Sequence, residues 1–142
     1  IFNESKKLGY ELLSYVHPTS TIGEDVKMGE NCLILENNVI KPYVTIGNNV
    51  MIQSSNVISH DVVIKDHCFI IHQVVISGYV TIEPYCIIAP NATIRNRVII
   101  AKECIIGMCT LIMKNTIEKG VYAVDSSQLL PVTSDRLKDI TS

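Results

Sequence analysis

The chain has 142 residues, of which 47% are hydrophobic and 18% are charged, so it has the length and apolar content of one folded domain. Its 12 Lys and Arg against 14 Asp and Glu give a formal charge of −2, which disfavours binding to nucleic acid or to an anionic membrane surface. The sequence lacks both a run of about 18 apolar residues and a basic stretch followed by an apolar one, so we expect a cytoplasmic protein.

The N-terminal residues 1–16 are predicted to be a short linker that leads into the domain. Because the chain begins with Ile1 rather than Met, we expect it to be a piece of a longer protein or to have been trimmed. His17 stands before Pro18, which favours an extended backbone, and we expect His17 to have only a local role.

Isoleucine recurs with a period of six along most of the chain. There are 22 Ile against 2 Phe and no Trp, and every sixth residue from Ile22 to Ile112 is Ile except Met28. This period fits neither a helix, whose apolar stripe recurs at about 3.6, nor a flat strand, whose inward face recurs at 2. It indicates short strands joined by corners, three to a coil of 18 residues. We therefore predict an all-β solenoid of triangular cross-section over residues 17–118, followed by a C-terminal tail at 119–142 in which residues 134–140 form a helix.

A second inward position lies two residues before each Ile and always holds a small or medium side chain, as a narrow interior requires. Glycine or another small residue often follows the Ile, and we interpret these small residues as the corners of the triangle: Gly23, Gly29, Gly47, Ser59, Ser77, Ala89 and Gly107. Asn38 and Asn56, 18 residues apart in the second inward position, are predicted to form a short hydrogen-bonded ladder.

Four of the five cysteines occupy the second inward position on one edge: Cys32, Cys68, Cys86 and Cys104. Their side chains point in the same direction along a ladder, so we predict free buried thiols rather than disulfides. The sequence has no Cys-x-x-Cys pair, which argues against a zinc site made by these residues.

His67 and His72 are five residues apart, as are two zinc-binding histidines of the hexapeptide carbonic anhydrases. Their phase differs, because His67 follows Ile64 by three residues and His72 follows Ile70 by two. We therefore expect no metal, and zinc-dependent carbonic anhydrase chemistry remains a minor alternative.

His60 and Asp61 fall at a corner outside both inward positions, so both side chains should face outward. A histidine can accept a proton near neutral pH, and an adjacent carboxylate can orient its ring. Eighteen residues later, on the next rung, stands Gly78, where a ligand could approach the backbone and its N–H could stabilise a developing oxyanion.

The repeat resembles the left-handed parallel β-helix of the hexapeptide acyltransferases over residues 17–115. The segments NVISHDVVI (56–64) and SGYVTI (77–82) are similar to the sialic acid O-acetyltransferase and nucleotide amino-sugar N-acetyltransferase group. The resemblance implies that His60 is the general base, that Asp61 orients it, and that Gly78 binds the acetyl-CoA thioester. Gly78 and Gly107 are the residues expected to contact the cofactor, and the acceptor is an amino or hydroxyl group of a sugar or nucleotide sugar. The resemblance further implies a nucleotide-sugar-binding domain before Ile1.

The sequence departs from this group at two places. Phe69 stands where many members carry a second histidine, and the tail VYAVDS (121–126) differs from their Val-Gly-x-Pro-Ala stretch. The acceptor and the coenzyme A contacts in the tail are therefore left open. The alternative function is a non-catalytic solenoid that serves as a binding or assembly module.

The residues just before the core isoleucines predict how copies of the chain associate. Two outward ladders are almost wholly apolar: Leu33, Met51, Phe69, Ile87 and Ile105 on one edge, and Val39, Val57, Val75, Thr93 and Leu111 on the next. The third begins with the mixed series Lys27, Thr45, Val63 and Thr81. Apolar strips of this length are larger than a soluble monomer usually exposes. We predict that they are buried between subunits, and the resemblance specifies a homotrimer.

Overall fold

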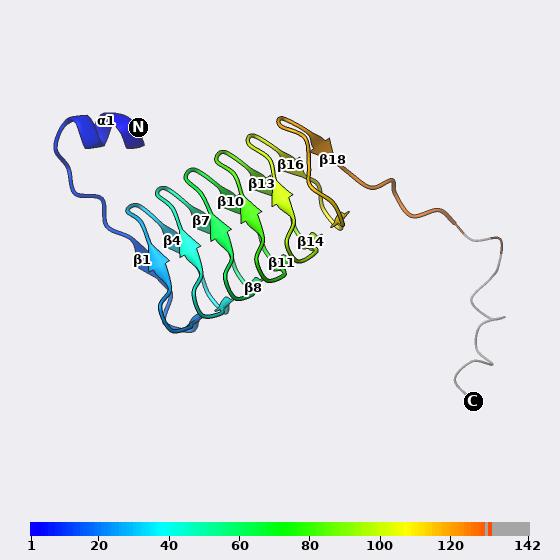
Figure 1. Cartoon of the computed structure of the whole chain (residues 1–142), viewed down its shortest axis with the longest axis horizontal. Coiled ribbons are helices and arrows are strands. Elements are labelled where there is room, and N and C mark those ends of the chain that lie inside the picture. Colours follow the sequence, from blue (N-terminus) through cyan, green and yellow to red (C-terminus); the bar gives the residue numbers. More distant parts are fainter. Residues whose placement is uncertain (130, 132–142) are drawn as a thin grey trace.

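The computed structural model describes residues 1–129 and 131, and it shows an all-β parallel solenoid of about six turns with one short helix (Figure 1). The predicted solenoid is thus confirmed. The elements in chain order are α1 (Phe2–Lys7), β1 (Tyr15–Val16), β2 (Thr21–Ile22), β3 (Lys27–Met28), β4 (Leu33–Ile34), β5 (Val39–Ile40), β6 (Thr45–Ile46), β7 (Met51–Ile52), β8 (Val57–Ile58), β9 (Val63–Ile64), β10 (Phe69–Ile70), β11 (Val75–Ile76), β12 (Thr81–Ile82), β13 (Ile87–Ile88), β14 (Thr93–Ile94), β15 (Ile99–Ile100), β16 (Ile105–Ile106), β17 (Leu111–Ile112) and β18 (Val121–Tyr122).

These strands form three parallel sheets, one on each side of the triangle. Sheet 1 has the order β1-β4-β7-β10-β13-β16-β18, sheet 2 the order β17-β14-β11-β8-β5-β2, and sheet 3 the order β15-β12-β9-β6-β3. Within sheet 1, Phe69 pairs with Met51 on one side and with Ile87 on the other, a step of 18 residues in each direction. Residues 18 apart therefore lie directly above one another, so the positions of side chains along each edge follow from sequence arithmetic.

The isoleucines that set the period fill the interior. From Ile34 to Ile106 each residue of this series is at most 2% exposed, and the second inward position is at most 3% exposed from Cys32 to Cys104. Ile22 and Met28, on the first rung, are 40% and 38% exposed because no complete rung covers them from below. The narrow interior accepts one branched and one compact side chain per strand, which explains the unusual composition.

The corners lie one or two residues later than the sequence interpretation placed them. After Ile22, for example, the turn occupies Glu24 and Asp25, and the second turn residue has a positive φ at every corner from Asp25 (52°) to Cys109 (57°). No glycine occupies these positive-φ positions of the coils; several hold Asn or Asp, which tolerate this region better than most residues.

The small residues after each isoleucine are required for a different reason, namely the closeness of the next rung. A Cβ on Gly23 would lie 2.5 Å from the Pro42 nitrogen and 2.7 Å from the Lys41 carbonyl carbon. Glycine here permits rung stacking rather than a left-handed turn.

The buried polar groups stack as predicted. Asn56 Nδ2 donates to Asn38 Oδ1 (3.0 Å) and to the Gln53 carbonyl (2.7 Å), while Asn56 Oδ1 accepts the Val74 N–H (2.8 Å). All five cysteines are free, and Cys109 alone is exposed. The Cys68 thiol donates to the Glu83 carbonyl (3.2 Å), and the neighbouring Cys86 thiol together with burial raises the pKa of Cys68.

Helical or strand elements lie within both predicted end segments, 1–16 and 119–142. Helix α1 occupies part of the predicted linker, and β1, at the end of that linker, already pairs with β4. Strand β18 falls within the predicted tail and pairs with β16. The expected helix at 134–140 lies outside the described residues. Within residues 1–129 and 131, no helix is long and apolar enough to cross a membrane.

Candidate functional site

The turns between sheets 2 and 3 form a column of outward-facing side chains that we call the His60 corner. His60 and Asp61 join β8 to β9, Pro42 and Tyr43 lie one rung below them, and Gly78 and Tyr79 lie one rung above. The rungs are held in register by backbone hydrogen bonds from the Asp61 N–H to the Pro42 carbonyl (3.2 Å) and from the Tyr79 N–H to the His60 carbonyl (3.2 Å).

His60 and Asp61 form a hydrogen-bonded pair at this corner. The distance from His60 Nδ1 to Asp61 Oδ2 is 2.9 Å, and the two side chains are 53% and 38% exposed. Asp61 has a φ of 57°, and this turn lets two adjacent side chains meet. Because a carboxylate only accepts hydrogen bonds, Nδ1–H is the donor, and in the neutral imidazole Nε2 then keeps its lone pair. The pair therefore has the form of a base with its orienting carboxylate.

Gly78 lies directly over the imidazole. A Cβ at this position would be 2.9 Å from Cε1 and 3.0 Å from Nε2 of His60. Among the described residues, no group accepts the Gly78 N–H. The missing side chain at Gly78 thus leaves the Cε1–Nε2 edge of His60 uncovered by the rung above.

Two further side chains, to which the sequence analysis assigned no role, complete the column. The Tyr79 ring contacts His60 edge-on, with centroids 5.1 Å apart and planes at 87°, and the Arg97 guanidinium carbon lies 4.6 Å from the centre of the Tyr79 ring. Asp61, Tyr79 and Arg97 are successive 18-residue steps. That spacing was the feature of the sequence from which their proximity could have been inferred.

Charge is distributed unevenly along the His60 corner. On the rungs above Gly78, Arg95, Arg97 and Lys114 are all exposed, and residues 93–97 and 111–116 contain no Asp or Glu. Below His60, the turn of the first rung carries Glu24 and Asp25. The exposed Lys41 lies near these two carboxylates, so an excess of positive charge is found only on the C-terminal side of the corner, where an anionic ligand would be favoured.

The other residues singled out from the sequence lie elsewhere. Gly107 follows β16 at a different corner, where a Cβ would be 2.9 Å from the Tyr122 carbonyl oxygen, so it is not brought together with Gly78. His67 precedes sheet 1 and its Nδ1 is 2.9 Å from Asn49 Nδ2, whereas His72 follows sheet 1 and its Nδ1 is 2.9 Å from Gln53 Oε1. The two imidazoles therefore occupy different corners of one chain.

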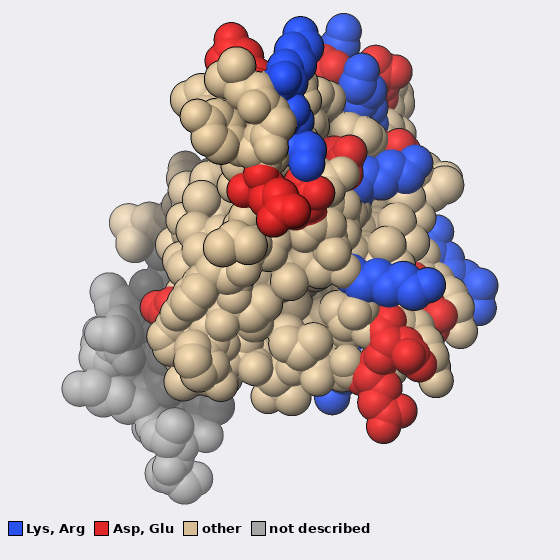
Figure 2. All heavy atoms as spheres, turned by 90° about the vertical axis from the view of Figure 1, so that its left-hand side faces the viewer, with Lys and Arg blue, Asp and Glu red and all other residues tan. Residues whose placement is uncertain are grey.

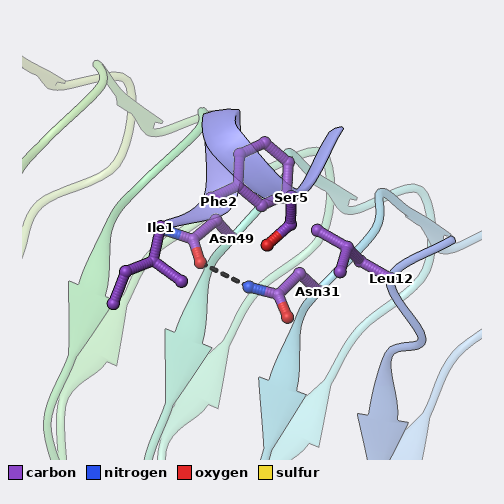
Figure 3. Close-up of a pocket in the computed structure, with 6 residues that line it drawn as sticks. All are labelled: Ile1, Phe2, Ser5, Leu12, Asn31 and Asn49. Carbon is purple, nitrogen blue, oxygen red and sulfur yellow. Dashed lines mark hydrogen bonds between the residues drawn. The ribbon is translucent and has the colours of Figure 1, made fainter. Parts of the chain in front are cut away.

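A hollow of about 450 Å³ lies under α1, away from the His60 corner (Figure 3). Figure 3 shows Asn31 and Asn49 hydrogen-bonded across its floor, with Phe2 and Leu12 at its sides. In the part of the chain that the structure describes, no three His, Cys, Asp or Glu side chains converge in a way that could hold a metal ion.

The family model described as "Bacterial transferase hexapeptide (six repeats)" matches residues 25–60 and 61–96. No curated protein sequence matches the chain.

Solved structures show the same fold at low sequence identity. A mutant of GDP-perosamine N-acetyltransferase from Caulobacter crescentus, in complex with CoA and GDP-perosamine, is 18% identical with a TM-score of 0.83, over 84% of this chain and 57% of that one. The acetyltransferase domain of PglB from Neisseria gonorrhoeae is 16% identical with a TM-score of 0.81, over 84% of this chain and 58% of that one. A mutant of AntD, an N-acyltransferase from Bacillus cereus in complex with dTDP and coenzyme A, is 14% identical with a TM-score of 0.72, over 98% of this chain and 93% of that one. The chain spans about 57% of the length of the first of these structures.

Proposed function

The chain belongs to the hexapeptide-repeat family of bacterial transferases, and on that premise we propose that it transfers an acetyl group from acetyl-CoA to an amino or hydroxyl group of a sugar or nucleotide sugar. The observation that carries the proposal is the His60–Asp61 pair, 2.9 Å apart beneath the open backbone of Gly78. The complexes of the structural neighbours with CoA, GDP-perosamine and dTDP support the choice of substrates.

In the proposed reaction, His60 Nε2 removes the proton from the acceptor amine or hydroxyl as that group attacks the thioester carbonyl carbon. Asp61 accepts from Nδ1–H and stabilises the imidazolium that forms. The Gly78 N–H donates to the carbonyl oxygen as it gains charge. A bond from nitrogen or oxygen to the acyl carbon forms, the carbon–sulfur bond breaks, and the proton on His60 passes to the coenzyme A sulfur.

The charge of the His60 corner favours one orientation of the two substrates. Arg95, Arg97 and Lys114 are exposed on the rungs above Gly78, where phosphate groups of coenzyme A would be attracted. With coenzyme A on that side, the acceptor would approach from the side of Pro42 and Tyr43.

We further propose that the active protein is a homotrimer, with the substrates in a groove between neighbouring copies. Met51, Ile87 and Ile105 on sheet 1 are 37–42% exposed, and Val57 and Val75 on sheet 2 are 38% and 40% exposed. Figure 2 views the N-terminal end of the solenoid and shows Lys, Arg, Asp and Glu side chains mainly in its upper and right-hand parts. Two apolar faces that share a corner can both be covered in a closed ring of three.

The test measures release of free coenzyme A from acetyl-CoA in the presence of a panel of nucleotide-linked amino sugars. His60→Ala should lower the turnover number by about 10²–10⁴, the usual contribution of a general base. His67→Ala is the control, since that imidazole lies at the corner between sheets 3 and 1, where its Nδ1 is 2.9 Å from Asn49 Nδ2. A His60→Ala protein that works at the wild-type rate would overturn the mechanism. A chain that shows no saturable heat on calorimetric titration with acetyl-CoA would instead be the non-catalytic solenoid.

A further inference from the structure

We propose that Tyr79 is a positioning residue that fixes the orientation of the His60 imidazole, with Arg97 holding the Tyr79 ring in turn. The proposal rests on the proposed role of His60 as the base. It adds a residue that acts on His60 rather than on a substrate.

The His60 ring needs such support because little else restrains it. Its side chain is 53% exposed, and its single hydrogen bond runs from Nδ1 to Asp61, which is itself 38% exposed. One hydrogen bond at one ring atom leaves the ring free to pivot about that atom. Gly78, on the rung above, has no side chain, so no side chain at that position restrains the imidazole.

The Tyr79 ring meets the imidazole in a geometry that opposes this pivoting. The centroids are 5.1 Å apart and the planes lie at 87°, which is the edge-to-face arrangement that aromatic pairs prefer. The backbone keeps Tyr79 at this place, because its N–H donates to the His60 carbonyl (3.2 Å). Rotation of the imidazole toward Tyr79 would bring the two rings closer than this contact distance, so steric repulsion opposes it.

Arg97 restrains Tyr79 from the next rung. The Arg97 guanidinium carbon lies 4.6 Å from the ring centre, within the range of a cation–π contact. The backbone N–H of Arg97 donates to the Gly78 carbonyl (3.0 Å). No described residue forms a hydrogen bond with the Tyr79 hydroxyl. The aromatic ring, and not the hydroxyl group, is therefore the part of Tyr79 that acts on His60.

Tyr85 supplies a matched control at another corner. It has the same turn position as Tyr79, a φ of 63° against 61°, and an exposed fraction of 50% against 47%. It also lies against a histidine, His67, with ring centroids 4.7 Å apart. Replacing Tyr85 removes the same amount of aromatic surface without touching His60.

The experiment compares Tyr79→Leu, Tyr79→Phe and Tyr85→Leu in the full chain. Two readouts are used: steady-state kinetics with acetyl-CoA, and ¹⁵N NMR of the histidine side chains, in which the His60 signals are identified by their loss in His60→Ala. Wild-type His60 should show mainly the Nδ1–H tautomer. In Tyr79→Leu, kcat should fall by about 10- to 100-fold, as expected for a base misplaced by about 1 Å, while the KM for acetyl-CoA changes by less than about threefold.

The same variant should show a mixture of His60 tautomers, whereas Tyr79→Phe should restore both readouts and Tyr85→Leu should leave both unchanged. Wild-type kcat and tautomer in Tyr79→Leu would overturn the proposal. So would a Tyr79→Phe protein as impaired as Tyr79→Leu, because the hydroxyl would then be the acting group. If the wild-type chain has no transferase activity, the proposed function fails, and the tautomer measurement alone decides whether Tyr79 orients His60.

Discussion

Replacing Gly78 with alanine should damage activity without weakening the fold. The added Cβ would lie 2.9 Å from Cε1 and 3.0 Å from Nε2 of His60. Non-bonded carbon atoms are at their optimum at about 3.5–4.0 Å, so the ring must move by roughly 0.5–1 Å. Because the His60 side chain is 53% exposed, it can move into solvent and relieve the clash at little cost in stability.

The same movement disturbs the proposed chemistry. A shift of about 1 Å at a reacting group can cost about 10²-fold in rate, which corresponds to a loss of about 2.7 kcal/mol of transition-state stabilisation. The assay is kcat with acetyl-CoA, measured beside the thermal unfolding midpoint. We expect kcat of Gly78→Ala to fall by about 10²-fold while the midpoint changes by no more than about 2 °C. Gly78→Val should be more severe, because a branched side chain fills more of the space above His60.

Gly47→Ala is the control with the opposite expectation: it should weaken the fold and leave the His60 corner unchanged. Its Cβ would lie 2.8 Å from the Asp66 nitrogen and 2.9 Å from the Lys65 carbonyl carbon, which are backbone atoms of the next rung and cannot swing aside. Overpacking of this kind costs about 1–3 kcal/mol of stability, while the His60 corner is untouched. The reasoning is refuted if Gly78→Ala keeps wild-type kcat, or if it lowers the unfolding midpoint as much as Gly47→Ala.

Two further predictions concern the core and the outer faces. Asn56→Ala should lower the free energy of unfolding by about 1–3 kcal/mol for each buried group left unpaired, the Val74 N–H among them, and an unchanged midpoint in urea would contradict this. Met51→Glu or Ile87→Glu should dissociate the proposed trimer and reduce activity together, because each places a charge in an apolar interface. Sedimentation that finds a stable monomer for the wild-type chain at micromolar concentration would refute both the trimer and the shared site.

The sequence by itself determined the solenoid, its interior and the alignment of the site. A coil of 18 residues converts position along the chain into position in space, so the stacking of Gly78 over His60 could be predicted by counting. The same counting predicted the ladder of Asn38 and Asn56 and the column of buried cysteines. The isoleucine period is strong because the narrow interior accepts one branched side chain and one compact side chain per strand, and isoleucine fills the branched position almost throughout.

The features that the sequence did not reveal are those that the repeat does not constrain. Helix α1 lies outside the repeat. The positive φ of the second turn residue could not be predicted from residue type, because the residues at this position include Asp25, Tyr43 and Arg97. The role of the small residues also required the structure, since only the approach of the Pro42 backbone explains the glycine at 23.

Counting also could not give the orientation of the exposed side chains at the His60 corner. The 18-residue step placed Tyr79 and Arg97 above Asp61, but not the edge-on contact with His60 or the guanidinium stacked on the Tyr79 ring. The backbone hydrogen bonds between rungs repeat with the sequence and fix which residues are neighbours. The torsion angles of half-exposed side chains depend instead on the particular groups around them, and the tertiary structure alone decided those.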